Sequence, residues 1–209
     1  MQVVTFETLP STQLYLVEQV KHGLVDLPLC VVAEKQSAGV GSRGCTWDCV
    51  QDGLTFSFGV ALSALASDVP RQSWSIYFGF LFKQSLQALG QEVWLKWPND
   101  LYKGVCKVGG IMSQIVQENL ICGIGLNLQD TRYGALGVLD KNLLLEAFLA
   151  QTEARLSWQE IIEAYRLEFK AHHQGHSFHH NGVKVSLDQA QVLEDGGLQI
   201  GDRVYYEAR

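Results

Sequence analysis

Apolar and polar positions follow two different periodicities along the first 175 residues of the chain. Runs rich in β-branched and aromatic residues predict strands, and these lie at 3–7, 29–33, 54–61, 93–96, 105–117 and 120–126. Apolar spacing near the helical repeat predicts helices, and these lie at about 11–23, 70–89, 143–151 and 158–171. Pro70 suits the start of the second helix, and Gly23 and Gly90 suit the ends of the first two. The mixture predicts an α/β body.

The pattern changes after residue 175, where only short β segments follow. They lie at 182–187, 190–193, 198–200 and 204–206, and Asp195-Gly196-Gly197 is a hairpin signal between two of them. The 34 residues from 176 to 209 are too few to hold a core of their own. We therefore expect two parts: a body over residues 1–175, and a small β segment over residues 176–209 that packs against it.

Composition limits the classes of function. Hydrophobic residues make up 47% of the chain and charged residues 18%, which predicts a packed core and not a disordered chain. The formal net charge of −6 gives no electrostatic reason to expect nucleic-acid binding. No apolar run approaches the ~20 residues of a membrane span, and the N-terminus has no basic flank or apolar leader. These features predict a soluble, cytoplasmic protein.

The cysteines agree with that location. There are five, and an odd number without a signal peptide indicates free thiols in a reducing compartment. The spacing of Cys45 and Cys49 could begin a metal site, but no second Cys or His pair follows at a zinc-like distance. We interpret them as small buried or loop thiols and predict no metal ligands.

The stretch KWPNDLYKGVCKVGGIM, which begins at Lys96, holds the first candidate chemistry. Lys96 ends an apolar strand and Lys107 lies within another, so each side chain could point into a site. A lysine aimed inward needs an anionic partner, either Asp100 or a ligand. Pro98 restricts the backbone before Asn99 and Asp100 and so helps to fix both side chains. This arrangement suits a ligand that carries a carboxylate and phosphates.

Two further polar features precede this stretch. Ser11-Thr12-Gln13 stands at a helix start, where it serves as a cap or grips a small polar ligand. The loop at 37–44 is too rich in glycine for a helix or strand, so it is either a surface turn or a cradle for phosphate. Gly39, Gly41 and Gly44 match G-x-G-x-x-G, but no helix follows them, which disfavours a dinucleotide site.

Two glycine pairs lie in the predicted strands, one near the end of the stretch that begins at Lys96 and one after it. Gly109-Gly110 allows close approach by another chain or a ligand. Gly123-x-Gly125-x-Asn127 ends a strand, and the Asn127 amide carries the donor and the acceptor that the edge of adenine needs. The alternative interpretation of this second motif is an ordinary strand end with an Asn turn.

Together these features resemble the biotin protein ligases. The most specific part is Lys96-Trp97-Pro98-Asn99-Asp100 followed by Lys107-x-Gly109-Gly110-Ile111, and the other motifs fall in the order of the family. The resemblance covers residues 1 to about 130 well and the C-terminal part loosely. It implies the biotin/lipoate ligase fold, which is a mixed sheet flanked by helices with a small SH3-like barrel, here shortened.

The resemblance implies a two-step reaction with biotin, ATP and Mg²⁺. Biotin and ATP form biotinyl-5′-AMP and pyrophosphate, and a lysine on the biotin carboxyl carrier domain of a carboxylase then takes the biotin and releases AMP. Lys107, with Lys96 and Arg43, would supply positive charge where the two anions meet. Asp100 would orient or deprotonate the incoming lysine.

The resemblance also implies a binding set. Ser11, Thr12 and Gln36 would hold the ureido ring, Trp47 would stack near adenine, and Asn127 would read its edge. The remaining implied ligand-binding residues are Gln13, Gly39, Val40, Gly41, Ser42, Asn99, Gly109, Gly110 and Gly123.

The sequence departs from the family in the glycine loop, which is commonly Gly-Arg-Gly-Arg-x-Gly-Arg. Val40, Ser42 and Cys45 stand where arginines are common, and only Arg43 remains. Arginine binds phosphate in a bidentate manner, so this loop should depend more on its backbone N–H groups. Gln13 also stands where asparagine is usual.

Several alternatives stay open. Some family members carry an N-terminal DNA-binding domain, but here the Ser-Thr signature begins at residue 11, so we expect no DNA-binding function. A lipoate or octanoate ligase shares the lysine chemistry, and a catalytically silent biotin-binding protein would fit the altered loop. Five of the six histidines lie at 172–180, as a metal site or a solvated segment. A homodimer is possible, because family members often pair through an edge strand.

Overall fold

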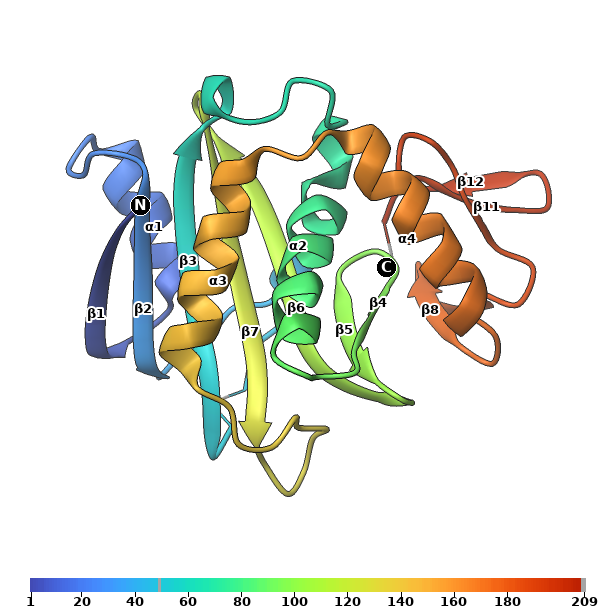
Figure 1. Cartoon of the computed structure of the whole chain (residues 1–209), viewed down its shortest axis with the longest axis horizontal. Coiled ribbons are helices and arrows are strands. Elements are labelled where there is room, and N and C mark those ends of the chain that lie inside the picture. The colour runs from blue at the N-terminus through green and yellow to red at the C-terminus, as the bar shows by residue number, and fades with distance from the viewer. Residues whose placement is uncertain (49, 208–209) are drawn as a thin grey trace.

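The computed structural model describes residues 1–48 and 50–207 of the chain. Cys49, interpreted above as a small buried or loop thiol, lies outside the described residues, and so does the side chain of Arg43. Within the described part, a seven-stranded sheet has the order β1-β2-β3-β7-β6-β5-β4 (Figure 1). Its strands are β1 (Gln2–Leu9), β2 (Leu29–Gln36), β3 (Asp52–Ala61), β4 (Trp94–Lys96), β5 (Asp100–Lys103), β6 (Cys106–Val116) and β7 (Asn119–Gln129).

The sheet is mixed. β1 and β2 run parallel, because α1 (Thr12–Lys21) crosses over between them, and every other neighbouring pair is antiparallel. Hairpins join β4 to β5, β5 to β6 and β6 to β7, so the four strands on this side of the sheet are consecutive in sequence. The other half is assembled from distant segments, since β3 pairs with β7.

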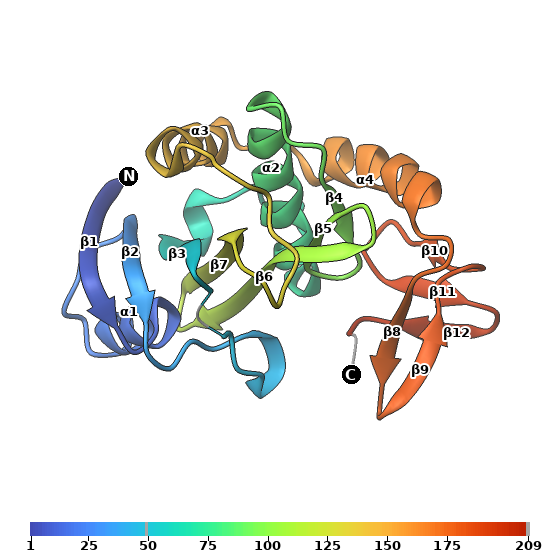
Figure 2. The ribbon, with the colours of Figure 1, turned by 90° about the horizontal axis from the view of Figure 1, so that it is seen from below.

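Helices cover the two faces unequally. α2 (Trp74–Ala88), α3 (Lys141–Ala154) and α4 (Trp158–His172) lie on one face, and α1 lies on the other (Figure 2). Because successive side chains of a strand point to opposite faces of the sheet, each strand contributes to the packing on both faces. On β3, Phe56 and Phe58 are fully buried in the core under the three helices, while Thr55 and Ser57 alternate with them toward the other face.

The main core lies between the sheet and α2. This helix is apolar nearly all round, because α3 and α4 flank it and the sheet lies beneath it. A smaller cluster joins Leu16 and Val17 of α1 to Val31 of β2. No helix in the described ranges is long and apolar enough to span a membrane.

The C-terminal part forms two small sheets. β8 (Ser177–His180) pairs with β9 (Val183–Ser186), and β11 (Leu198–Ile200) pairs with both β10 (Gln191–Val192) and β12 (Arg203–Tyr205). Phe178 and Leu198 belong to the same core as the body. The predicted fold class is confirmed: a mixed sheet flanked by helices with a small C-terminal β segment. The boundary at residue 175 stays a prediction.

Some element bounds differ from the sequence prediction. The helix expected from Pro70 begins at Trp74, because Pro70 is extended and a 3₁₀ turn, Arg71–Ser73, precedes α2. β2 continues through the polar residues 34–36, since pairing with β1 extends to Gln36. Neither β5 nor β8 was expected, because each is short and rich in polar residues.

Candidate active site

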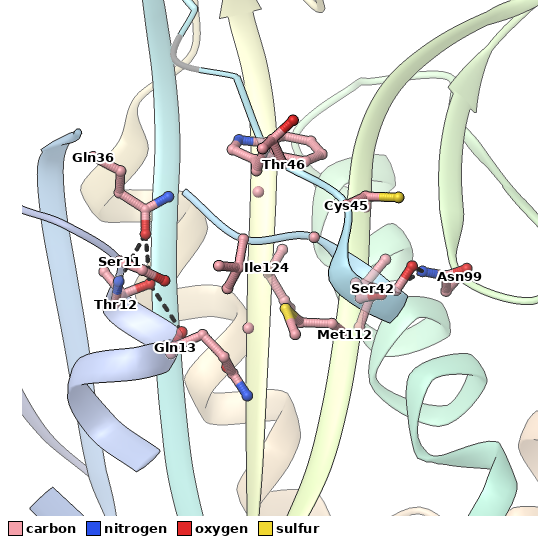
Figure 3. Close-up of a pocket in the computed structure, with 18 of the residues that line it drawn as sticks. Ser11, Thr12, Gln13, Gln36, Ser42, Cys45, Thr46, Asn99, Met112 and Ile124 are labelled. Atoms are coloured by element: carbon pink, nitrogen blue, oxygen red, sulfur yellow. Dashed lines mark hydrogen bonds between the residues drawn. The ribbon is translucent and has the colours of Figure 1, made fainter. Parts of the chain in front are cut away.

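A cavity opens on the face of the sheet that carries α1. Its lining comes from the start of α1, the end of β2, the loop at 37–48 and the middle strands of the sheet. Figure 3 shows Ser11, Thr12 and Gln36 on one side and Ser42 and Asn99 on the other, with Met112 and Ile124 between them. The cavity therefore has polar walls and a partly apolar middle.

Thr12 organises the polar wall near α1. Its backbone N–H and its hydroxyl donate to Gln36 Oε1 at 2.7 and 3.2 Å, and its hydroxyl shares a hydrogen bond with Ser57 at 2.9 Å. Ser11 caps the helix by accepting from the Leu14 N–H at 3.4 Å. Because the oxygen of Gln36 is occupied, its amide presents an NH₂ group as a donor, which points away from Thr12 in Figure 3.

Gln13 leaves an acceptor at the bottom of this wall. Its amide nitrogen donates to Ile121 O at 3.5 Å, while among the described residues no group donates to its buried Oε1. A Cβ at Gly123 would lie only 2.7 Å from that oxygen, so the glycine leaves room for it. A buried acceptor without a partner has a free-energy cost, and a ligand N–H group would remove it.

The loop at 37–48 folds back on itself over the cavity. Ser37 and Ala38 N–H groups donate to Leu9 and Pro10 carbonyls, and Val40 pairs with Thr46 across the loop. The N–H of Gly41 donates to Cys45 O at 2.7 Å.

This closure limits the phosphate cradle that the sequence suggests. The N–H of Trp47 donates to Gly39 O at 2.8 Å, so both this amide and that of Gly41 are engaged within the loop. Neither N–H is available to a phosphate in this conformation.

Trp47 divides the ligand space into two cavities. Its indole lies over the glycines of β6 and β7: a Cβ at Gly125 would lie 2.5 Å from Trp47 Cε2, and one at Gly110 would lie 3.3 Å from Cζ3. The same side chain lines the first cavity and a second one bounded by Asp48, Asn127 and Tyr133. The glycines predicted to permit close approach therefore make room for an aromatic ring of the chain itself.

The second cavity carries another unused acceptor. The Asn127 amide nitrogen donates to Gly134 O at 3.1 Å, and in the described part of the chain its buried Oδ1 has no donor. Tyr133 donates its hydroxyl to Asp48, and this hydrogen bond raises the pKa of Tyr133. A ligand with an amino group fits beside Asn127.

Lys107 lies where the cavities meet. Its Nζ is 2.6 Å from Asp100 Oδ1 and 5.9 Å from the centre of the Trp47 ring. The Lys107 side chain lines the first cavity, the second, and a third between Asp100 and the β8–β9 hairpin. Side-chain exposures of 44% for Lys107 and 22% for Asp100 leave the pair open to a ligand.

A β-bulge aims Lys107 at this point. Asp100 faces Gly110 and Leu101 faces Gly109, but Tyr102 faces Lys107, so the register shifts by one residue. In a regular strand, Lys107 and Gly110 would point to opposite faces. The bulge brings Lys107 to the face that carries Asp100, which is a known use of bulges beside sites.

Asn99 fixes the turn that presents Asp100. Its amide donates to Ile111 O at 2.6 Å and to Ser42 Oγ at 3.3 Å, and Ile111 N–H donates back to Asn99 O at 2.8 Å. The Trp97–Pro98 peptide within the turn is cis. Asn99 therefore joins the turn to β6 and to the loop over the cavity.

Lys96 is the more buried of the two site lysines, with 8% of its surface exposed. Its ammonium donates to the Tyr102 hydroxyl at 3.2 Å and lies 4.8 Å from the centre of that ring. Burial lowers the pKa of Lys96, while the charge of Asp100 opposes this shift. Lys96 lines the third cavity together with Asp100 and Lys107.

The structure brings most of the predicted set together. Around the first cavity it places Ser11, Thr12, Gln13, Gln36, Val40, Gly41, Ser42, Trp47, Asn99, Lys107, Gly110 and Gly123. Asn127 lines the second cavity, and Lys96 and Asp100 line the third. Gly109 lies beside Leu101 and Leu126, where a Cβ would meet Gly125 O at 2.8 Å, so it serves strand packing. The Gly39 backbone holds Trp47 in the loop.

Other lining residues gave little or no local signal in the sequence. Ser57, Met112 and Ile124 lie within apolar strands and read as core positions. Ser57, with Thr55 two residues before it, breaks the apolar run of β3, and that polar residue could have marked it. Tyr102 lies on β5 between the two halves of the Lys96–Ile111 motif, and Tyr133 lies beyond β7. Neither is a motif residue, and each joins the site only through the fold.

Fold and site together define a mixed α+β protein with a divided ligand site around a lysine–aspartate pair. The chain belongs to the biotin/lipoate A/B protein ligase family, whose family model matches residues 5–128.

Relatives of known sequence and structure agree with this family. A biotin–[acetyl-CoA-carboxylase] ligase of Mycobacterium tuberculosis is 29% identical over 161 residues, which cover 68% of this chain and 59% of that protein. The chain therefore spans about 59% of the length of that curated relative, and the same share of a bifunctional ligase/repressor of Salmonella typhimurium. A crystal structure of the biotin acetyl coenzyme A carboxylase synthetase of Helicobacter pylori, with bound biotinylated ATP, is 41% identical. It has a TM-score of 0.94 and covers 98% of both chains. The biotin protein ligase of Aquifex aeolicus, at 21% identity and a TM-score of 0.78, has the same fold over 99% of this chain and 96% of its own.

Proposed function

We propose that this chain attaches biotin to a lysine of a biotin carboxyl carrier domain, with ATP as the energy source. The observation that carries the proposal is the position of Lys107, whose side chain borders all three cavities beside Asp100. The 41% identity to a protein crystallised with biotinylated ATP supports the choice of ligands.

The first cavity suits biotin. The ureido ring offers two N–H donors and one carbonyl acceptor, and Gln13 Oε1 and the Gln36 NH₂ group supply the opposite partners. Thr12 and Ser57 add hydroxyl groups at the same wall. Met112, which pairs with Gly123 on the cavity face, gives the apolar part that the thiophane ring and the valeryl chain need. The biotin carboxylate would then extend toward Lys107.

The second cavity suits the nucleotide. Trp47 offers an aromatic face to adenine, and Asn127 Oδ1 offers the acceptor for its amino group. Asp48 and Asp100 are the carboxylates at the second and third cavities, and Mg²⁺ takes oxygen ligands from one or two carboxylates plus substrate phosphates. A magnesium ion that enters with ATP would be held by the substrate phosphates together with one of these carboxylates.

The first chemical step joins two anions. A carboxylate oxygen of biotin attacks the α-phosphorus of ATP, the bond to the bridging oxygen breaks, and pyrophosphate leaves. Repulsion between the anions opposes this step, and the charge of Lys107, backed by Lys96, reduces it. The side chain of Arg43 is proposed from the sequence alone to add to this charge.

The second step uses the third cavity. The carrier lysine would enter between Asp100 and the β8–β9 hairpin, and its neutral amine attacks the acyl carbon of biotinyl-5′-AMP. The carbon–oxygen bond breaks, AMP leaves, and the amine proton passes to Asp100 or solvent. Asp100 is positioned for this role because Asn99 fixes the turn that carries it.

We also infer a cytoplasmic location. Cys30, Cys45, Cys106 and Cys122 are free thiols in the described part of the chain, which suits a reducing compartment. A homodimer stays a prediction.

The test is intact-mass spectrometry of a purified biotin carboxyl carrier domain, incubated with this chain, MgATP and biotin. A second tube contains lipoate and a lipoyl domain, because the family includes lipoate ligases. We expect one biotin per carrier in the first tube, and none with Lys107→Ala. Lipoate transfer without biotin transfer would replace the proposal with the sister activity, and no transfer in either tube would favour a silent binding protein.

A further inference from the structure

Apart from His179, which lines the third cavity, the histidines at 172–180 have no part in the chemistry above. In residues 1–48 and 50–207, no three His, Cys, Asp or Glu side chains are grouped to hold a metal ion. The rings of His172 and His176 instead pack on Trp94: His172 stacks at 5.5 Å between ring centres, and His176 meets it edge-on at 4.9 Å. The predicted solvated segment is therefore partly packed against the body.

His176 also contacts Tyr102, which ties the segment to the site. The two rings are nearly perpendicular with centres 5.5 Å apart, and Trp94 lies 5.6 Å from Tyr102 on the neighbouring strand. Trp94 itself is buried and donates its indole N–H to Gly104 O at 3.1 Å. Tyr102 is thus held between a fixed indole and an imidazole.

Tyr102 in turn holds Lys96. The Lys96 ammonium donates to the hydroxyl at 3.2 Å, and its 4.8 Å distance from the ring centre is within the range of a cation–π contact. A long lysine side chain loses rotamer freedom when it is fixed. The hydrogen bond to the Tyr102 hydroxyl and the contact with its ring offset this loss of side-chain entropy before any substrate binds.

We propose, on the basis of the function above, that Tyr102 is a positioning residue that keeps the Lys96 ammonium charged and aimed into the third cavity. His176 is its brace, because its ring packs edge-on against both Tyr102 and Trp94. Lys96 then stands as a preorganised second cation beside Lys107.

The charges around Lys96 explain why it needs this support. Asp100 on β5 favours the ammonium, whereas burial and Lys107 on β6 disfavour it and together lower the pKa of Lys96. An acceptor that bonds to the charged form opposes that shift. Of the hairpin residues that line the same third cavity, His179 and Lys184 are the titratable ones, and neither supplies negative charge.

His176 has to be neutral in this arrangement. Burial lowers its pKa, and the charges of Lys96, His172 and His173 lower it further. A protonated imidazole would repel the ammonium that Tyr102 holds. The brace therefore acts through the ring and not through a charge.

The first test measures the pKa of Lys96 without any substrate. The protein is labelled with ¹³Cε-lysine, the Lys96 signal is identified by its loss in Lys96→Arg, and wild type is titrated beside Tyr102→Phe. Tyr102→Phe keeps the ring and removes only the acceptor, so the pKa of Lys96 should fall. Tyr15→Phe, which removes a hydroxyl from α1 beside Phe6, is the matched control and should leave it unchanged. An equal Lys96 pKa in wild type and Tyr102→Phe overturns the proposal.

The second test measures adenylate formation against pH. One hydrogen bond to a charged group corresponds to about tenfold in rate, so Tyr102→Phe should lower kcat about tenfold. Because the pKa of Lys96 falls, the alkaline limb of the profile should move to lower pH. A loss of rate with an unmoved alkaline limb would mean a purely structural role.

The brace is tested by a pair of variants. His176→Ala should lower kcat severalfold, and His176→Phe, which restores an uncharged ring, should recover most of it. Equal loss in both variants, or none in His176→Ala, overturns the brace. If wild type forms no adenylate at all, the proposed function fails, while the substrate-free titration still decides the role of Tyr102.

Discussion

The indole N–H of Trp97 donates to the carbonyl of Gly196 at 3.0 Å. This bond joins the turn that presents Asp100 to the hairpin signal of the C-terminal segment, 99 residues away in sequence. The fully buried Trp97 ring also meets Phe178 edge-on at 5.2 Å between ring centres. The small β segment therefore supports the site from behind.

Replacing Trp97 by Phe should test this support. The variant keeps an aromatic ring but leaves Gly196 O without its donor, so the free energy of unfolding should fall by about 1–2 kcal/mol. Trp158→Phe is the matched control. Trp158 lies on α4, and its indole N–H donates at 2.7 Å to the carbonyl of Glu194, two residues before Gly196. Urea denaturation should show similar losses, whereas only Trp97→Phe should lower kcat. Equal kcat in both variants would show that the bond has no effect on the site.

Adding one methyl group at Gly125 should displace Trp47. The new Cβ would lie 2.5 Å from the indole, and overpacking of this kind costs about 1–3 kcal/mol. We expect ATP to bind about tenfold more weakly, measured by calorimetry. Gly59→Ala on β3, where the new Cβ would meet the side-chain ends of Leu27 at 2.8 Å and Ile121 at 3.0 Å, should lower stability without changing ATP affinity. An unchanged affinity in Gly125→Ala would exclude Trp47 from the nucleotide site.

Replacing Asp100 by Asn should separate the two half-reactions. The amide cannot accept the proton of the carrier lysine, so transfer from preformed biotinyl-5′-AMP should slow by about 100-fold or more. Adenylate formation should change less, because the substitution leaves the Lys107 side chain, 2.6 Å from this carboxylate, in place. Rapid-quench assays of each step measure both rates. Two unchanged rates would remove Asp100 from the mechanism.

Replacing Glu168 by Gln should destabilise the whole fold. Glu168 pairs with Lys83 of α2, and its other oxygen accepts the Leu95 N–H of β4 at 2.9 Å. With side-chain exposures of 5% for Lys83 and 11% for Glu168, the substitution leaves a buried ammonium unpaired and should cost about 3–5 kcal/mol. The double variant Lys83→Met, Glu168→Gln should recover much of this loss in urea denaturation. A double variant as unstable as the single one would contradict the ion-pair account.

Stability should fall as the solution becomes mildly acidic. The pKa of His176 lies below 6.5 in the folded state, so between that lowered value and about 6.5 the unfolded chain binds more protons. Stability therefore rises with pH through this window and is lost as pH falls through it. Urea denaturation at about pH 5 to 8 should show a shallower dependence in His176→Phe. Parallel curves for the two proteins would show that His176 does not contribute.

How far the sequence predicts the fold depends on the length of each element. Long apolar runs such as those of β3 and β7 are evident from composition, because both contribute a buried face. β5 is only four residues long and half polar, and its pairing with β4 and β6 makes it a strand. Tertiary pairing, and not local propensity, decides such elements.

The features of the site also divide into those that the sequence predicts and those that only the folded chain determines. The sequence identifies Lys107 and Asp100, since an inward lysine needs an anion. It contains no sign of the bulge that brings Lys107 to the correct face, because a register shift depends on the partner strand. It also cannot show that the loop amides of Gly41 and Trp47 are engaged within the loop.

Gly110, Gly123 and Gly125 form a floor without side chains beneath Trp47 and Gln13, held in the ladders of β6 and β7. Such a floor has no side-chain rotamers to lose when a ligand arrives. The residues of the walls, chiefly Gln13 and the loop at 37–48, therefore lose most of the conformational entropy when a ligand binds. Differences in affinity between this chain and its relatives should arise there, while the floor contributes a nearly constant share.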